Sequence, residues 1–360
     1  MNPLHLYVVR SMESKMNKAI IGVDLAKKVI QVCSYANKKV RSNVEMTPKE
    51  FTFWLSTIQP SIVVFEACGT SNYWKQLSDS LGHDSRIISP KLVSSVRQNQ
   101  KTDRNDALAI VQAAMLPDVS FSAGKSIEQQ QLQSLMRLRE LSVKQKTAAK
   151  NQIIALLAEF NIKPSPSRGG LSSCIESTLE DGENGLSYEF RTALSTAWQQ
   201  YLSHVEAVRC YDTCLERSMQ AQPNCKKLLK IEGVGVLNAV NLYIALGCAD
   251  SGVFANGKSA SAYIGLTPIQ HSSGGKVKLG SIGRRVRNSI LRSQLITGAM
   301  AVVRNLSNRV PKTKKELWLN DLINRKGKKC AAVALANKNV RTAFAMLSQG
   351  TEYKAELIAQ

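Results

Sequence analysis

One stretch of the chain, residues 126–160, contains neither glycine nor proline. Its leucine, isoleucine and methionine residues recur at intervals of three and four, the spacing that lines one face of an α-helix. The stretch therefore predicts a long amphipathic helix. We expect it to pair with a second helix at about 187–220 as a helical hairpin or coiled-coil arm, for core packing or self-association. Residues 163–185 between them are rich in proline, serine and glycine, and predict a loop or mobile linker.

The residues before this arm alternate between strand and helix patterns. Short β-branched runs at 19–23, 29–33, 61–65 and 86–89 predict strands, and the segments at 47–58, 71–81 and 91–98 predict helices. Thr47 and Pro48 have the residue types of an N-cap and a first helical position. Such alternation is typical of an α/β domain.

Four carboxylates occupy positions where an α/β sheet presents ligands. Asp24 and Glu66 each follow a predicted strand, and Asp103 and Asp106 lie three residues apart where a helix could begin. That spacing places the last two on one helix face. Converging carboxylates repel one another unless a divalent cation lies between them, and Mg²⁺ prefers carboxylate oxygens. Singly, each acid is as well explained as a surface or capping residue. The set predicts a Mg²⁺ site, with Mn²⁺ as the alternative ion.

Positive charge dominates the chain, with 48 Lys and Arg against 27 Asp and Glu and a net charge of +21. Lys276–Arg341 holds 17 of these cations but only two acids, Glu316 and Asp321. Such one-sided charge favours a phosphate-binding surface over a solvated helix face. No window of 18 apolar residues suits a membrane span, and we expect a cytoplasmic, nucleoid-associated bacterial protein. The cysteines form no CxxC pair, which favours reduced thiols over a zinc site.

The second half of the chain predicts a further, mostly helical domain. Its segment 228–239 is similar to a helix-hairpin-helix turn, in which Gly233 and Gly235 leave backbone amides free for a phosphate. An ordinary turn between core helices is an equally good interpretation. We expect five parts: an N-terminal extension at 1–15, an α/β domain at 16–125, the helical arm and linker at 126–222, the helical domain at 223–348 and a tail at 349–360.

Three motifs, taken in order, resemble the DEDD, RuvC-like domain of one family of insertion-sequence transposases. They are Gly22-Val-Asp24-Leu-Ala-Lys, Phe65-Glu66-Ala-Cys-Gly-Thr and Lys101-Thr-Asp103-Arg-Asn-Asp106-Ala. The family is related to the Piv DNA invertase and the MooV recombinase, and its members are described as bridge-RNA-guided recombinases. The resemblance implies a RuvC- or RNase H-like fold for the first domain. It also implies that Asp24, Glu66, Asp103 and Asp106 are catalytic and hold the metal.

Two further segments are similar to the second signature of the same family, Gly265-Leu-Thr-Pro268 and Ser273-Gly. Family members use a serine in the Ser-Gly segment as nucleophile on DNA. The resemblance aligns Ser273 with it, with Ser272 as the alternative. Gly283-Arg-Arg-Val-Arg-Asn288 departs from the family's usual Ser-Lys-x-Gly-Asn but keeps its charge. The residues expected to contact nucleic acid are Arg97, Lys101, Arg104, Lys276, Lys278, Arg284, Arg285, Arg287 and Arg292.

The resemblance implies a DNA transposase or site-specific recombinase. It would cleave and rejoin DNA by Mg²⁺-dependent transesterification through a phosphoserine, guided by an element-encoded RNA, as a homodimer or homotetramer without a membrane partner. Two alternatives stay open. One is a RuvC-type Holliday-junction endonuclease that activates water and leaves Ser273 idle. The other is a non-catalytic nucleic-acid-binding protein, whose mark would be a missing acid.

Overall fold

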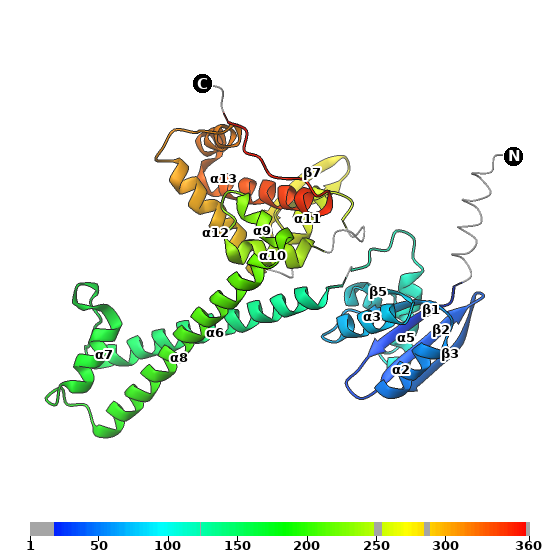
Figure 1. Ribbon diagram of the computed structural model, residues 1–360, viewed down its shortest axis with the longest axis horizontal. Coiled ribbons are helices and arrows are strands. Elements are labelled where there is room, and N and C mark those ends of the chain that lie inside the picture. The colour runs from blue at the N-terminus through cyan, green and yellow to red at the C-terminus, as the bar shows by residue number, and fades with distance from the viewer. Residues whose placement is uncertain (1–17, 123, 248–253, 284–288, 358–360) are drawn as a thin grey trace. The chain divides into compact units, whose positions relative to one another are not determined.

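The computed structural model describes residues 18–122, 124–247, 254–283 and 289–357. The chain divides into two compact units (Figure 1). The first ends at Ser126 and also includes the short segment that ends at Ala255, and the second takes up the rest of the chain from Ile127. The N-terminal extension expected at 1–15 lies outside the described residues. Among the residues that are described, no helix is long and apolar enough to cross a membrane.

The first unit is built on a five-stranded sheet with the order β3-β2-β1-β4-β5. Strands β1, β4 and β5 run parallel, whereas β2 is antiparallel to both β1 and β3. Strand β3, which was not predicted from the sequence, is a largely exposed edge strand whose apolar residues Val40, Val44 and Met46 are interspersed with polar and charged ones. The strands are β1 (Ile20–Leu25), β2 (Ile30–Ala36), β3 (Lys39–Met46), β4 (Ile62–Glu66) and β5 (Asp84–Ile88).

Helices cover both faces of this sheet. Side chains alternate between faces along each strand, so Val23 and Val32 pack with α2 and α3, whereas Val64 packs with α4 and α5 on the opposite face. Thr47 caps α2, as its sequence predicts, and the structure adds a capping box with Glu50. The mixed α/β character expected for this part of the chain is confirmed. The helices are α2 (Pro48–Thr57), α3 (Ser71–Ser80), α4 (Pro90–Val96) and α5 (Asp103–Ala114).

The second unit opens with the predicted helical hairpin, formed by α6 (Ile127–Glu159) and α8 (Tyr188–Gln220) (Figure 1). An ion pair between Arg139 Nε and Asp212 Oδ1, 2.5 Å apart, joins the two helices. Their outer ends are held by a small apolar core that includes Leu157 and Trp198. The helices and their pairing therefore follow the apolar spacing of the sequence.

The expectation of a loop or mobile linker at 163–185 is wrong. A short 3-10 helix, η1 (Pro166–Arg168), leads into α7 (Gly170–Glu180), which packs on the end of the arm. Ile175 is fully buried there with Leu157. Within this glycine- and serine-rich sequence, apolar residues recur at helical spacing and form one apolar helix face. Burial of that face against the arm outweighs the poor helix propensity of the segment.

The described residues in the remainder of the second unit form mainly helices, together with a β-hairpin. The hairpin consists of β6 (Pro268–Ser273) and β7 (Lys276–Ile282), and almost all of it is exposed. The helices are α9 (Pro223–Lys226), η2 (Lys227–Lys230), α10 (Val236–Leu246), α11 (Gly257–Ile264), α12 (Ser289–Leu306) and α13 (Lys314–Ser348). Gly327 interrupts α13, because its φ of 79° and ψ of 165° are not helical.

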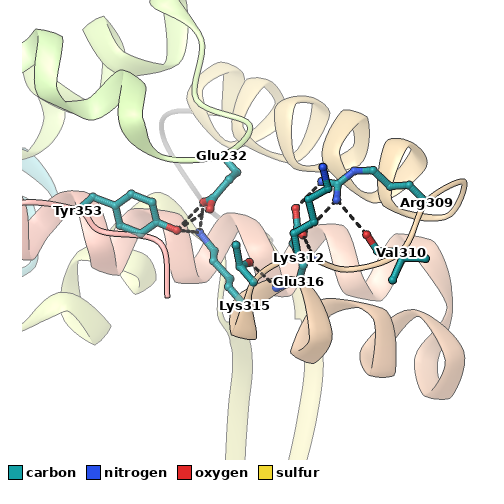
Figure 2. A network of polar contacts seen from close by, with 8 residues as sticks. Glu232, Arg309, Val310, Lys312, Lys315, Glu316 and Tyr353 are labelled. Atoms are coloured by element: carbon teal, nitrogen blue, oxygen red, sulfur yellow. Dashed lines mark hydrogen bonds and ion pairs between the residues drawn. The ribbon is translucent and has the colours of Figure 1, made fainter. Parts of the chain in front are cut away.

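A polar network fastens the C-terminal segment to this helical unit (Figure 2). The Glu232 carboxylate accepts hydrogen bonds from Lys315 Nζ and from the Tyr353 hydroxyl, each at 2.7 Å. Beside it, Arg309 is paired with Glu316, which also accepts from the backbone N–H of Lys312 at 2.7 Å. The segment expected to be a tail thus carries Tyr353, one of the three side chains in a largely buried cluster.

Candidate active site

The first unit brings the predicted acids to one end of its sheet. Asp24 lies near the carboxyl end of β1 and Glu66 is the last residue of β4. These strands are parallel neighbours, so their ends meet at the same edge. Asp103 and Asp106 occupy the first turn of α5, where the helix dipole favours negative charge. The cap of that helix is Thr102, whose hydroxyl accepts from Asn105 N at 3.3 Å.

Close packing against Gly22 sets the position of α5 over β1. A Cβ atom at Gly22 would lie 2.5 Å from the carbonyl oxygen of Ala107 and 2.8 Å from Val111 Cγ2. Only glycine permits this approach. Since Gly22 precedes Asp24 by two residues and Ala107 directly follows Asp106, the same contact places the start of α5 over the end of β1.

The acids are near enough to perturb one another. Burial raises the pKa of Asp24, and the charges of Asp106 and Asp103 raise it further. Burial also raises the pKa of Glu66, as do the charges of Asp24 and Asp106. The nearby negative charges disfavour ionisation of Asp24 and of Glu66, which is the response expected of like charges sharing a partly desolvated space. Within the described parts of the chain, no three His, Cys, Asp or Glu side chains are arranged to hold a metal ion.

Two cations offset part of this negative charge. Arg97 Nη1 lies 2.6 Å from Asp106 Oδ1, and the charge of Lys101 lowers the pKa of both Asp24 and Glu66. Arg97 was expected to contact nucleic acid, but its guanidinium is engaged by Asp106. Oxygen donors with raised pKa values and a local excess of negative charge have the chemistry that suits a hard divalent cation.

Sequence reasoning missed two polar residues beside the acids. Gln31 Nε2 donates to Asn43 Oδ1 at 2.7 Å, and Asn43 Nδ2 donates to the carbonyl oxygen of Arg104 at 2.9 Å. Gln31 is buried although it lies in an apolar run, and that contrast was the available signal. Both residues border an open pocket, lined by Gln31, Asn43, Glu45, Thr102, Asp103 and Arg104.

The predicted nucleophile lies in the second unit, at the tip of the β6–β7 hairpin. Ser273 is the last residue of β6 and pairs with Lys276 across a turn made by Gly274 and Gly275, both with positive φ. Its side chain is exposed. Ser272 is its neighbour on the strand and accepts a hydrogen bond from Gln270 Nε2 at 3.0 Å. The hairpin thus leaves the Ser273 hydroxyl accessible and places a lysine opposite it.

The basic residues expected to bind nucleic acid fall into three groups. Lys276 and Lys278 are exposed on β7, and Arg104 is exposed on α5. Arg292 is half-buried and donates to the carbonyl oxygen of Gly283 at 2.6 Å, so part of its guanidinium is already used. The remaining three, Arg284, Arg285 and Arg287, lie outside the described residues.

Comparison with known proteins gives the class of this protein. Residues 21–162 match the family model of a DEDD transposase of the IS110 type. Residues 225–315 match that of the transposase IS116/IS110/IS902 family. The first match contains all four acids and the second contains Ser273. The chain is therefore a transposase, an enzyme whose substrate is DNA.

Individual relatives cover nearly the whole chain. The transposase for insertion sequence element IS1111A of Coxiella burnetii is 35% identical over 93% of this chain and 91% of its own. A probable family 20 transposase of Pseudomonas aeruginosa is 33% identical over 94% of this chain and 99% of its own. A pilin gene-inverting protein of Moraxella bovis is 25% identical over 80% of this chain and 84% of its own. The chain belongs to the IS110/IS116/IS902 family of insertion-sequence transposases.

Proposed function

We propose that this transposase breaks and rejoins DNA by transesterification, with Ser273 as nucleophile and with Asp24, Glu66, Asp103 and Asp106 as the metal-binding set. The observation that carries the proposal is that Asp24 and Glu66 lie at the ends of neighbouring strands beside the first turn of α5, where burial and nearby carboxylates raise the pKa of both. A surface or capping role for each acid separately gives no reason for that arrangement. The strand order β3-β2-β1-β4-β5, in which β2 runs opposite to the other four strands, supports a RuvC-like fold for the first unit.

The four carboxylates would hold Mg²⁺, with Mn²⁺ as the alternative. Bound there, the ion would polarise the phosphate oxygens and offset the charge that develops on them. Asp24 and Glu66 come from the rigid sheet, whereas Asp103 and Asp106 come from the helix that Gly22 holds against it. Arg97 already compensates part of the charge of Asp106.

The Ser273 hydroxyl would attack a DNA phosphorus. The Oγ–P bond forms, the bond from phosphorus to the departing sugar oxygen breaks, and the hydroxyl proton ends on that oxygen. Rejoining reverses these steps when another sugar hydroxyl attacks the phosphoserine, so the energy of the phosphodiester is conserved. A serine hydroxyl needs activation. His271 lies two residues away on the same strand and hence on the same face of the hairpin.

The remaining parts of the proposal rest on the family resemblance. Ser273 would meet the acids within a homodimer or homotetramer, and the paired helices α6 and α8 would serve that assembly. An RNA encoded beside the gene would select the target by base pairing. The exposed cations of α5, β7 and α13 would bind the nucleic-acid backbones through charge.

The test is recombination between a donor and a target plasmid, with and without the flanking non-coding RNA. Wild-type protein should give recombinants only with the RNA, and a covalent protein–DNA adduct that survives denaturing electrophoresis. Ser273→Ala should abolish both products. Ser272→Ala is the matched control, because it removes the neighbouring hydroxyl from the same exposed strand, and it should retain both. Cleavage by Ser273→Ala without an adduct would instead identify a hydrolytic, RuvC-type enzyme.

A further inference from the structure

Three carboxylates of like charge, Asp24, Asp103 and Asp106, lie near one another at the candidate active site. Asp103 and Asp106 start α5, and they face Asp24 at the end of β1 closely enough to raise its pKa. Repulsion between these charges acts to lift the start of the helix from the sheet. Three contacts oppose this: Ala107 and Val111 pack on the sheet just beyond the first turn, Arg97 pairs with Asp106, and Asn105 donates to the Gln100 carbonyl oxygen. None of these joins the backbone of the first turn to the sheet directly.

The strand register shows which residues can do so. Gly22, Cys33 and Asn43 are directly opposite one another on β1, β2 and β3. Cross-strand neighbours share a face of the sheet. Cys33 packs against Ala107 and Val111 of α5, so Asn43 is on the face that α5 covers. The next row, two residues along, consists of Asp24, Gln31 and Glu45 on the same face.

Gln31 and Asn43 form a relay that ends on the backbone of this first turn. Asn43 Nδ2 donates to the Arg104 carbonyl oxygen at 2.9 Å, one residue after Asp103. Gln31 Nε2 donates to Asn43 Oδ1 at 2.7 Å, which fixes the rotamer of Asn43. Gln31 is itself held, because it is 5% exposed and lies directly opposite Asp24. The relay therefore connects the strand beside one acid to the helix turn that carries two others.

We propose that Gln31 and Asn43 are positioning residues that hold the start of α5 against the sheet, so that Asp103 and Asp106 stay beside Asp24 when no cation separates them. This deepens the proposed function and rests on its metal site. Neither side chain touches the reacting atoms. Their effect is to preorganise the carboxylates, so that the divalent cation does not have to draw the helix in when it binds.

The experiment measures the Mg²⁺ concentration that half-saturates two responses of the full-length protein, its thermal stabilisation and its recombination rate. Asn43→Ala should raise this concentration roughly three- to tenfold in both responses, which is the effect expected from the loss of one hydrogen bond. At saturating Mg²⁺ much of the rate should return. Gln31→Met tests the second link with a side chain of similar shape, and it should give a smaller shift in the same direction. Val44→Ala, an exposed change on the opposite face of the same strand, should give none.

The possible failures can be told apart. If wild type responds to Mg²⁺ and Asp24→Asn does not, but Asn43→Ala and Gln31→Met keep the wild-type half-saturation, the relay is refuted and the metal site stands. A variant that melts earlier without Mg²⁺ and still half-saturates like wild type also refutes the relay, because its role is then only structural. If wild type shows no Mg²⁺ response at all, the metal site fails and the relay fails with it.

Discussion

Asp24 is the residue at which function and stability conflict. Burial and two neighbouring carboxylates raise its pKa above the ordinary value of 3.8. The contribution of protonated Asp24 to the free energy of unfolding is therefore fully present below pH 3.8, and it is lost as the pH rises through the raised pKa. At neutral pH the metal-free protein carries an ionised group that the folded state disfavours. An active site commonly accepts such a cost.

Asp24→Asn should therefore stabilise the metal-free protein while abolishing recombination. We expect a thermal midpoint a few degrees above that of wild type at pH 8 in the presence of a chelator, and a smaller difference at pH 4, close to the ordinary pKa of 3.8, because protonation of Asp24 relieves the same strain in wild type. Thermal unfolding at both pH values measures this. Glu183→Gln, which neutralises an exposed loop carboxylate, is the control and should leave both midpoints unchanged. A midpoint for Asp24→Asn below that of wild type at pH 8 would contradict the electrostatic account.

At the scale of elements, the contact of β1 with α5 depends on one glycine. A methyl group at Gly22 would meet the Ala107 carbonyl oxygen at 2.5 Å, so Gly22→Ala must push the helix away. We expect a loss of about 1–3 kcal/mol of stability, as for other overpacked cores, and a loss of recombination because Asp106 moves with the helix. Gly69→Ala is the control, since nothing lies within 4 Å of a Cβ there. Chemical denaturation of both variants measures the difference. Equal free energies of unfolding for the two variants would show that α5 can move away from β1 without loss of stability.

A second prediction at this scale concerns Lys315, which belongs to the network of Figure 2. Its side chain is 13% exposed and paired with Glu232, so Lys315→Met leaves a largely buried carboxylate without its cation. Such a change costs on the order of 3–5 kcal/mol. The neighbouring Lys314 pairs with Glu356 at the surface, where both side chains are about 70% exposed, so Lys314→Met should cost less than about 1 kcal/mol. Denaturant titration compares them. Similar losses would mean that the Glu232 network contributes no more than a surface ion pair.

The elements also show what the sequence could and could not reveal. Apolar strands that each end in an acid predicted Asp24 and Glu66 at one sheet edge, because short strands and their ends are local patterns. The contact of Asn43 with Arg104 joins residues 61 positions apart and has no local signature. The β6–β7 hairpin was missed for another reason. Its strands are short and almost wholly exposed, even at Val277 and Leu279, so the hairpin depends on cross-strand pairing and not on the burial of an apolar face.

For the molecule as a whole, the net charge of +21 indicates a nucleic-acid surface only where the cations concentrate. One concentration of it lies at the kink of α13, where Arg325, Lys326, Lys328 and Lys329 flank Gly327. All four side chains are exposed. None of them takes part in an ion pair that the structure describes. Exposed cations without such a pair remain free to neutralise phosphates. Because Gly327 kinks α13, the cations before and after it extend from helix segments that run in different directions.

Lys328→Gln combined with Lys329→Gln should weaken binding to duplex DNA evenly across sequences. If both lysines neutralise phosphates, the slope of log affinity against log salt becomes shallower by about 2, at roughly 0.9 for each phosphate that is no longer neutralised. Fluorescence anisotropy of labelled, unrelated duplexes between low and moderate salt measures this slope. Lys38→Gln combined with Lys39→Gln is the matched control, since it removes the same charge from an exposed pair at the β2–β3 turn. The control should lower affinity only slightly, through net charge, and leave the slope unchanged. If the two double variants changed the slope equally, the kink of α13 would contribute only to the overall positive field, and the DNA would lie elsewhere on the protein.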